Sequence, residues 1–382
     1  MIGHYLYRTE NEILSPISIS VVPLIMSHMQ NYLAASTVTE LAICYTGLHS
    51  FFSDRTHRTR VVLCLSDVAV LMSGVVQGSG AGPMLFLIYI DDLAKLFQRY
   101  GIAARLFADD VKVYLEITGH EDVVRLQKAL DVITAWASEW QLSVSVSKCN
   151  ILTVGPSCYE ADYYVSGIQL LKCATCRNLG VTITSDLTPT QHIHDIVLKA
   201  HQRANHIIRC FISGYITLLV KAFTVYVRPI LEYNSVILSP CTKKEIDQIE
   251  KVEWRFTKRL HGFKNFTYEV RLVRLGIPSL ELHRLHLDLI YRYKLVFVLI
   301  CLGIEQLFAF SPVSATRGHA YKLYKPQCAN AVRKNFFTER VVNVWNSLPH
   351  DVDLSSLSKF RCSINQVDFS QFLRCMEYGL AV

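Results

Sequence analysis

Two adjacent aspartates lie between two short stretches rich in apolar residues that favour β-strands. The apolar run Ala103–Phe107 leads into Asp109 and Asp110, and residues 111–116 then alternate between apolar and polar types. A period of two over such short runs favours β-strands. The pattern therefore predicts a β-hairpin with the two aspartates at its tip.

Other stretches have the period of an amphipathic helix. Apolar residues recur every three or four positions within 84–97 and again within 121–140, and Glu121 and Asp122 fall in the favourable first turn of the second stretch. We predict a helix at each place, and a mainly helical region from 191 to about 304. The apolar run 295–304 is shorter than the roughly 20 residues that cross a bilayer, so we predict a buried helix there.

Shorter alternating runs predict further extended segments. Residues 60–65 and 178–184 read as strands, and residues 140–155 as a strand or an extended loop. Together with the hairpin and the helices they predict an α+β fold.

Composition and charge narrow the class of protein. The chain has 382 residues, of which 51% are hydrophobic, so it can bury the cores of two or three domains. Residues 1–190 carry 13 Lys and Arg against 17 Asp and Glu, whereas the remainder carries 26 against 15. An acidic half joined to a basic half suits a protein that holds a polyanion near metal ions, although such asymmetry also arises without function.

The sequence also bears on compartment. No basic start followed by an apolar core and a cleavage site is present, so we expect no signal peptide and no membrane association. Twelve scattered cysteines then read as reduced thiols of an intracellular protein, in the nucleus or the cytoplasm. The oligomeric state stays open.

The aspartate pair is the first candidate for chemistry. Two adjacent carboxylates repel each other and resist desolvation, and a divalent cation makes such an arrangement favourable. The alternative is that Asp109 and Asp110 are ordinary turn residues. About 30 residues upstream, four glycines within 74–82 give a backbone that a bulky ligand can approach closely.

These two motifs, in this order and at this spacing, resemble the palm of reverse transcriptases of non-LTR (LINE-like) retrotransposons. The resemblance is carried by Gln-Gly-Ser at 77–79 with Gly-Pro-x-Leu-Phe at 82–86, followed by Phe-Ala-Asp-Asp at 107–110. It extends over about residues 51–350. It implies an RNA-directed DNA polymerase, a nucleotidyltransferase that binds an RNA template and a DNA primer or the RNA–DNA hybrid.

The resemblance also implies roles for individual residues. Asp109 and Asp110 would be catalytic and would bind Mg²⁺ if the chain is active. Lys148, in a Trp-x-Leu run that matches the family incompletely, would lie near the incoming nucleotide, although a surface lysine fits equally well. The residues expected along the nucleotide and the template are Gln77, Gly78, Ser79 and Phe107.

A second acidic pair, Asp91 and Asp92, follows Tyr89 and imitates the Tyr-x-Asp-Asp box of other polymerases. It continues a helical apolar pattern, with Lys95 and Arg99 after it and no strand. We therefore reject this pair as catalytic.

One departure from the family weighs against activity. The family pattern requires a third aspartate from a strand 40 to 50 residues before the segment that begins at Phe51. That window falls on residues 1–17, and the first aspartate of the sequence is Asp54. We expect a chain truncated at its N-terminus, without the fingers region or the first catalytic aspartate, and inactive alone.

The predicted organisation has four parts: an unmatched segment over 1–50, an incomplete palm over 51–190, a basic helical thumb-like region over 191–304 and a C-terminal segment over 305–382. Whether the chain by itself is an enzyme stays open. The alternatives to polymerase activity are a non-catalytic nucleic-acid-binding remnant and a translated relic of a retroelement.

Overall fold

The computed structural model describes residues 14–22, 53–71, 78–140, 142–155, 159, 161–211, 214–300, 307–311, 319–327 and 331–375. The chain forms two compact units. The sheet unit comprises residues 12–176, and the helical unit comprises residues 177–382 together with 1–11. Each unit is described by itself.

The sheet unit is built on a mostly antiparallel sheet with the strand order β12-β9-β1-β7-β6, in which β8 also pairs with β1. Among the described strand pairs of this sheet, β12 and β9 run parallel and the others antiparallel. The strands of this sheet are β1 (Leu14–Val22), β6 (Ala103–Phe107), β7 (Asp110–Glu116), β8 (Ser143–Val144), β9 (Asn150–Leu152) and β12 (Leu171–Cys173).

The predicted hairpin is confirmed. Strands β6 and β7 pair antiparallel, with Phe107 opposite Asp110, so the connecting turn consists of Ala108 and Asp109. Strand β1 lies along the other side of β7 over its whole length, from Leu14 opposite Glu116 to Ser20 opposite Asp110. The hairpin therefore has a neighbouring strand that comes from about 90 residues earlier in the chain.

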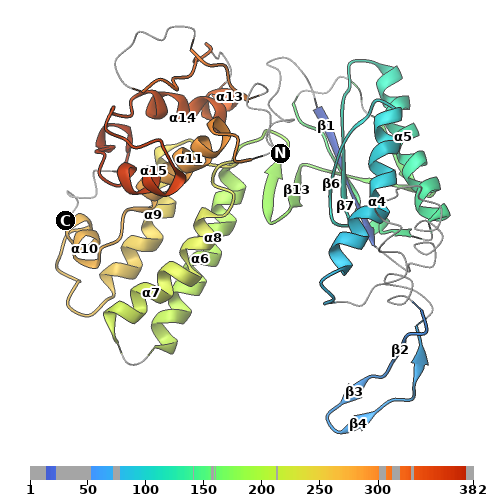
Figure 1. Ribbon diagram of the computed structural model, residues 1–382, viewed down its shortest axis with the longest axis horizontal. Coiled ribbons are helices and arrows are strands. Elements are labelled where there is room, and N and C mark those ends of the chain that lie inside the picture. Colours follow the sequence, from blue (N-terminus) through green and yellow to red (C-terminus); the bar gives the residue numbers. More distant parts are fainter. Residues whose placement is uncertain are drawn as a thin grey trace. The chain divides into compact units, whose positions relative to one another are not determined.

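Two helices cover one face of this sheet (Figure 1), and both were predicted. Helix α4 (Gly82–Arg99) and helix α5 (His120–Glu139) supply their apolar sides to the core. Alternate residues of β7 point into the same core, which contains Val111, Val113, Leu93, Phe97, Leu126 and Leu130 among other buried residues. Each fully buried side chain of this kind stabilises the fold by about 1.5–3 kcal/mol. The apolar faces marked by the period-two and period-3.6 patterns therefore pack against each other, with the helices on the sheet.

The single strand predicted over residues 60–65 is wrong. The segment is a ribbon in which β3 (Arg60–Val61) pairs with β4 (Cys64–Leu65), while β2 (Thr56–His57) pairs with β5 (Ala69–Val70). The chain reverses at Val62, whose φ is +56°. The alternating run pairs with itself across a two-residue turn, and a period of two cannot reveal such a reversal.

The other two extended segments are also interrupted. Residues 140–155 contain β8, a 3₁₀ turn over Val146–Lys148 and β9. Residues 175–184 form a hairpin of β13 (Thr175–Asn178) and β14 (Val181–Thr184). Its turn holds Leu179 at a φ of +44° and Gly180 at +82°, so the strand predicted over 178–184 is wrong at this turn. A further small hairpin joins β10 (Tyr164–Val165) and β11 (Ile168–Gln169).

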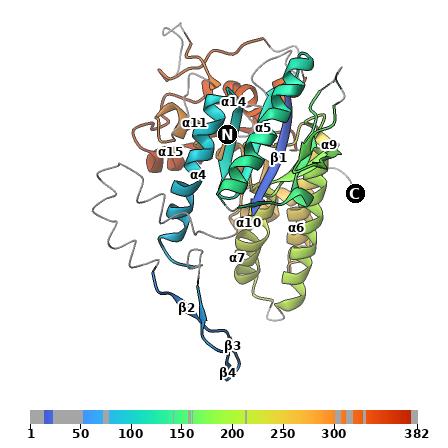
Figure 2. The same cartoon turned by 90° about the vertical axis from the view of Figure 1, so that its right-hand side faces the viewer.

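The helical unit agrees with the predicted helical region. Its helices are α6 (Thr190–Cys210), α7 (Ile216–Tyr226), α8 (Arg228–Glu232), α9 (Lys243–Lys258), α10 (Tyr268–Leu275), α11 (Leu280–Val296), α13 (Ala331–Asn335), α14 (Phe337–Asn346) and α15 (Leu357–Ile364). Figures 1 and 2 show α6 and α7 side by side. With the sheet unit, this confirms an α+β fold.

Local sequence explains where these helices begin. Thr242 precedes α9, and its hydroxyl accepts a hydrogen bond from the backbone N–H of Glu245, whose carboxylate in turn accepts one from the Thr242 N–H. This reciprocal capping satisfies two donors that the first turn leaves without partners. Two apolar cores then hold the helices: one around Phe223 on α6–α9 and one around Trp345 on α11, α14 and α15.

The buried helix predicted over residues 295–304 is only partly correct. Leu295 and Val296 are buried at the end of α11, but Val298 and Leu299 lie outside the helix and are 74% and 56% exposed. Val298 has a φ of +53°, which ends the helical path, and residues 301–306 lie outside the described residues. Among the described helices, none is long and apolar enough to cross a membrane.

Candidate functional site

The tip of the β6–β7 hairpin carries the aspartate pair at one end of the sheet. Asp109 is the second residue of the turn and Asp110 is the first residue of β7, and both are half-buried. The preceding Ala108 has a φ of +49°, a conformation that costs energy for a residue with a Cβ atom and that is common at functional sites. The carboxylates are therefore held on a short, strained turn that solvent and ligands can reach.

Strand β1 determines what lies beside them. Its register places Ser20 opposite Asp110 and Ser18 opposite Lys112. Residues directly opposed in an antiparallel pair have Cα atoms about 4.5–5.5 Å apart. The nine residues of β1 include no aspartate or glutamate, so the position nearest to Asp110 on this strand holds a serine.

A buried lysine follows on the same side of β7. Lys112 is two residues after Asp110, so the two side chains leave the strand on the same face, and Lys112 is only 8% exposed. Burial lowers the pKa of this lysine to about 8, while Asp110 and Cys176 act in the opposite direction. At neutral pH a positive charge therefore sits next to the aspartate pair.

The donor set suits Mg²⁺ in kind but falls short in number. Carboxylate oxygens are the ligands that Mg²⁺ prefers, and the ion completes its six-fold shell with waters and substrate phosphates. Among the described residues, no group of three or more His, Cys, Asp or Glu side chains lies close enough to hold a metal ion. Asp109 and Asp110 therefore form an incomplete protein shell.

The glycine-rich loop leads into α4. Gln77 lies outside the described residues. Gly78 has a φ of +86°, which favours glycine, and the Ser79 hydroxyl accepts a hydrogen bond of 3.1 Å from the N–H of Gly82 at the start of the helix. Because the chain turns back at residues 100–102 from α4 into β6, the N-terminal half of α4 lies at the same end of the sheet unit as the hairpin tip.

Phe107 and Lys148 are both at this end. Phe107 is the last residue of β6, opposite Asp110, and is 64% exposed. Lys148 is exposed on the 3₁₀ turn that follows β8, and β8 pairs with Val21 and Val22, next to Ser20. The structure thus brings Phe107, the aspartate pair and the turn carrying Lys148 to the same end of β1.

The second acidic pair is helical, as predicted. Asp91 and Asp92 lie in α4, where Asp91 forms an ion pair of 2.8 Å with Lys95. Asp92 accepts a hydrogen bond of 3.4 Å from the indole N–H of Trp136 on α5. Both carboxylates have structural partners away from the hairpin tip.

Two neighbours of the site escaped the sequence reasoning. Lys112 is one polar residue in an alternating strand, and nothing local marks it as buried. Ser20 belongs to a strand that was not predicted, although Ile17, Ser18 and Ile19 alternate with it in the same period of two that revealed the hairpin. That alternation was the available signal.

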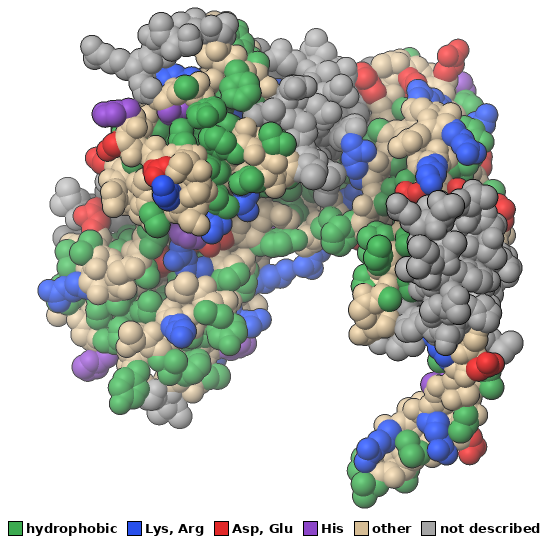
Figure 3. All heavy atoms as spheres, in the orientation of Figure 1, with side chains coloured by type: hydrophobic (Ala, Val, Ile, Leu, Met, Phe, Trp, Pro, Cys, Tyr) green, Lys and Arg blue, Asp and Glu red, His purple; other side chains and the backbone are tan. Residues whose placement is uncertain are grey.

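The ribbon β2–β5 is the other exposed feature of the sheet unit. It carries Arg55, Arg58 and Arg60 together with apolar side chains at its turn, where Val62 and Leu63 are each 84% exposed. Figure 3 shows these apolar and basic side chains on the surface of the ribbon. The Nε of Arg58 and that of Arg60 each donate to a carbonyl of the ribbon, at 3.0 and 3.1 Å.

Comparison with known proteins shows what this part of the chain is similar to. Residues 36–183 match the family model described as reverse transcriptase (RNA-dependent DNA polymerase). The chain is 26% identical to "Probable RNA-directed DNA polymerase from transposon BS" of Drosophila melanogaster over 63% of this chain and 27% of that protein. It is 24% identical to "RNA-directed DNA polymerase from mobile element jockey" of Drosophila funebris over 56% and 25%, respectively. It is 23% identical to "Probable RNA-directed DNA polymerase from transposon X-element" of Drosophila melanogaster over 60% and 26%.

The matched residues include the hairpin, the glycine-rich loop and both helices that cover the sheet. This part of the chain matches a reverse transcriptase domain. The relatives named here are polymerases of mobile elements, and this similarity supports the LINE-like, non-LTR resemblance seen in the sequence. The chain spans about a quarter of the length of these curated relatives.

Proposed function

We propose that the chain derives from the RNA-directed DNA polymerase of a LINE-like element and holds an RNA template and a DNA primer, or the hybrid they form. The observation that carries the proposal is the strained turn with Asp109 and Asp110 inside a matched reverse transcriptase domain. The excess of basic residues after position 190 supports the binding of a polyanion.

In this proposal the residues at the hairpin tip have separate roles. Asp109 and Asp110 hold Mg²⁺, which when bound stabilises negative charge on the triphosphate and on the primer oxygen. Gln77, Gly78 and Ser79 lie along the nucleotide and the template, and the exposed ring of Phe107 packs against them. Lys148 interacts with the phosphates that leave. A site of action inside the cell, in the nucleus or the cytoplasm, accompanies this function.

We further propose that the chain alone does not polymerise DNA. Ser20 occupies the register position nearest to Asp110, and β1 has no carboxylate at any position. Loss of one ligand from a metal site of this kind costs several kcal/mol of transition-state stabilisation, which corresponds to orders of magnitude in rate. The remaining function is then binding of nucleic acid without catalysis, and the basic second half favours it.

Two measurements on the full chain test these statements. The first is binding of a labelled RNA–DNA hybrid at increasing salt: we expect affinity that falls steeply with salt, because phosphate contacts release counterions. The absence of binding, or affinity indifferent to salt, would refute the proposal. The second is primer extension on an RNA template with Mg²⁺: we expect no product, and extension abolished by Asp110→Asn would show that the site is complete.

A further inference from the structure

The helical unit contains a cavity of about 450 Å³ that the proposed function does not use. It lies between α10, the start of α11 and the segment 367–375. Its walls are largely apolar, and the apolar lining residues are Leu272, Val273, Ile277, Pro278, Leu282, Val367, Phe369 and Leu373. Val273 at its edge is 82% exposed. A concave apolar surface of this volume is typical of a site that binds a ligand or the side chains of a partner.

The charged residues of this cavity all have one sign. Four carboxylates line it, Glu250, Glu269, Glu281 and Asp368, and none of the lining residues is Lys, Arg or His. This is unusual within the part of the chain after residue 190, which carries 26 basic against 15 acidic residues. We call this cavity the acidic pocket.

Glu250 is the one of these carboxylates on which a basic side chain, that of Arg284, acts electrostatically among the described residues. Among the described residues, Glu281 accepts hydrogen bonds from the backbone N–H groups of Arg374 and Cys375, and Asp368 accepts one from the N–H of Ser370. Glu250 accepts one from the Tyr268 hydroxyl at 2.6 Å and one from the N–H of Glu281. None of the four forms an ion pair with a described Lys, Arg or His, so the carboxylates at the rim, Glu269 and Asp368, face solvent without a basic partner among these residues.

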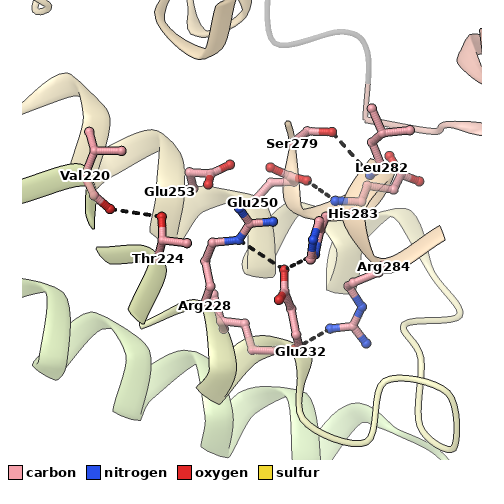
Figure 4. A network of polar contacts seen from close by, with 12 residues as sticks. Val220, Thr224, Arg228, Glu232, Glu250, Glu253, Ser279, Leu282, His283 and Arg284 are labelled. Carbon is pink, nitrogen blue, oxygen red and sulfur yellow. Dashed lines mark hydrogen bonds and ion pairs between the residues drawn. The ribbon is translucent and has the colours of Figure 1, made fainter. Parts of the chain in front are cut away.

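The nearby arginines are engaged elsewhere. Arg284 donates to the carbonyl oxygens of Leu231 and Leu238, and Arg340 forms an ion pair of 2.8 Å with Asp288. Figure 4 shows Arg284 beside Glu232, and Arg284 also acts electrostatically on Glu250, which lines the pocket. For the rim carboxylates Glu269 and Asp368, an external cation would supply the complementary charge.

We propose that the acidic pocket is a docking site for a polypeptide segment of another protein in which an apolar side chain is flanked by Lys or Arg. The apolar walls exclude water around the anchoring side chain, and the carboxylates at the edge select basic neighbours and disfavour acidic ones. Glu269 and Asp368 are exposed at the rim of the pocket. Their charges therefore discriminate between basic and acidic peptide segments at the rim.

The chain's own C-terminal residues have the wrong chemistry for this role. The seven residues after Cys375 contain no Lys or Arg and one glutamate. Charge complementarity thus favours a foreign basic segment over this part of the chain.

Glu250 supplies an internal reporter of binding. Burial raises its pKa to about 7, and the groups around it are Tyr268 from α10, Glu281 and Arg284 from α11, and Glu253 from its own helix. A cation that enters the pocket favours the ionised carboxylate, so binding near neutral pH releases protons. The heat of binding measured by calorimetry should then differ between buffers of different ionisation enthalpy.

The test uses the full chain and a synthetic 14-residue amphipathic helix of leucine and lysine, with a leucine and glutamate helix as its counterpart. We expect the lysine peptide to bind, with proton release, and the glutamate peptide not to bind. The variant Glu269→Gln/Asp368→Asn should bind the lysine peptide at least about fivefold more weakly, since two rim ion pairs are lost. The matched control is Glu121→Gln/Glu139→Gln on α5, which removes the same charge from the sheet unit and should leave affinity unchanged.

Three results would overturn the proposal: no binding of the lysine peptide, equal loss in the control variant, or binding that the rim substitutions leave unaltered. A chain ending at Cys375 provides a further arm. If only that shortened chain binds the peptide, the pocket is occupied by the last seven residues and the proposal is wrong. The binding of an RNA–DNA hybrid, measured in the same samples, reports the proposed polymerase-derived function separately.

Discussion

Replacing Ser20 with aspartate should give the hairpin tip a third carboxylate and with it a measurable affinity for divalent metal. Ser20 is the residue of β1 that pairs with Asp110, so the new carboxylate starts from a Cα atom about 5 Å away. A doubly charged ion about 5 Å from one added negative charge gains ~1.7 kcal/mol at the dielectric constant of water, or about 20-fold in affinity. Weaker screening at the half-buried tip raises this value, and desolvation of the new carboxylate lowers it.

The same substitution has a cost in the absence of metal. Like charges directly opposed in a sheet destabilise it by about 0.2–1 kcal/mol. The Ser20→Asp chain should therefore melt at a slightly lower temperature than the parent in EDTA and recover when Mn²⁺ is added. The assay is Mn²⁺ titration followed by electron paramagnetic resonance, with a thermal melt on the same samples.

The matched control is Ser18→Asp. It adds the same charge to the same strand two residues away, but its partner across the sheet is Lys112 rather than Asp110. We expect an interaction with the lysine and no gain in Mn²⁺ affinity. Equal Mn²⁺ affinity in both variants, or no gain in Ser20→Asp, would refute the register argument and the view that this position lacks the third ligand.

Three further predictions concern the helical unit. Burial raises the pKa of Glu253 from 4.5 to about 8, so the folded state favours the protonated carboxyl. The resulting stability is complete below pH 4.5 and is lost as the pH rises to about 8. The melting temperature should therefore fall over this pH range, and it should fall less steeply in the Glu253→Gln variant. Gly180→Ala should destabilise the chain by about 1 kcal/mol or more in urea unfolding, because its φ is +82° and an added Cβ would lie 3.2 Å from the Tyr233 ring. Gly167→Ala, at a φ of +76° with open space around it, should cost less, and an equal cost would contradict the steric argument. Trp345→Ala should cost about 3–5 kcal/mol, because this side chain is fully buried, and a cost below 1 kcal/mol would mean that the core around it is loose.

The sequence by itself determined the elements whose pattern is local. The hairpin around Asp109 and Asp110, helices α4 and α5, and the helical character of the second half all follow from periods of two or 3.6 residues, since such periods reflect which face of a single element is buried. The rejection of Asp91 and Asp92 rests on the same principle, because both continue a helical pattern.

The tertiary structure decided what depends on partners far away in the chain. That Ser20 lies beside Asp110 follows from the register between β1 and β7, which hydrogen bonds between residues about 90 positions apart define. The run 60–65 folds back on itself rather than joining the sheet. A self-paired ribbon and a strand of a larger sheet show the same alternation of residue types, so the sequence pattern does not distinguish them. The acidic pocket is assembled from residues between 250 and 375, and the gathering of its four carboxylates becomes visible only when those segments pack together.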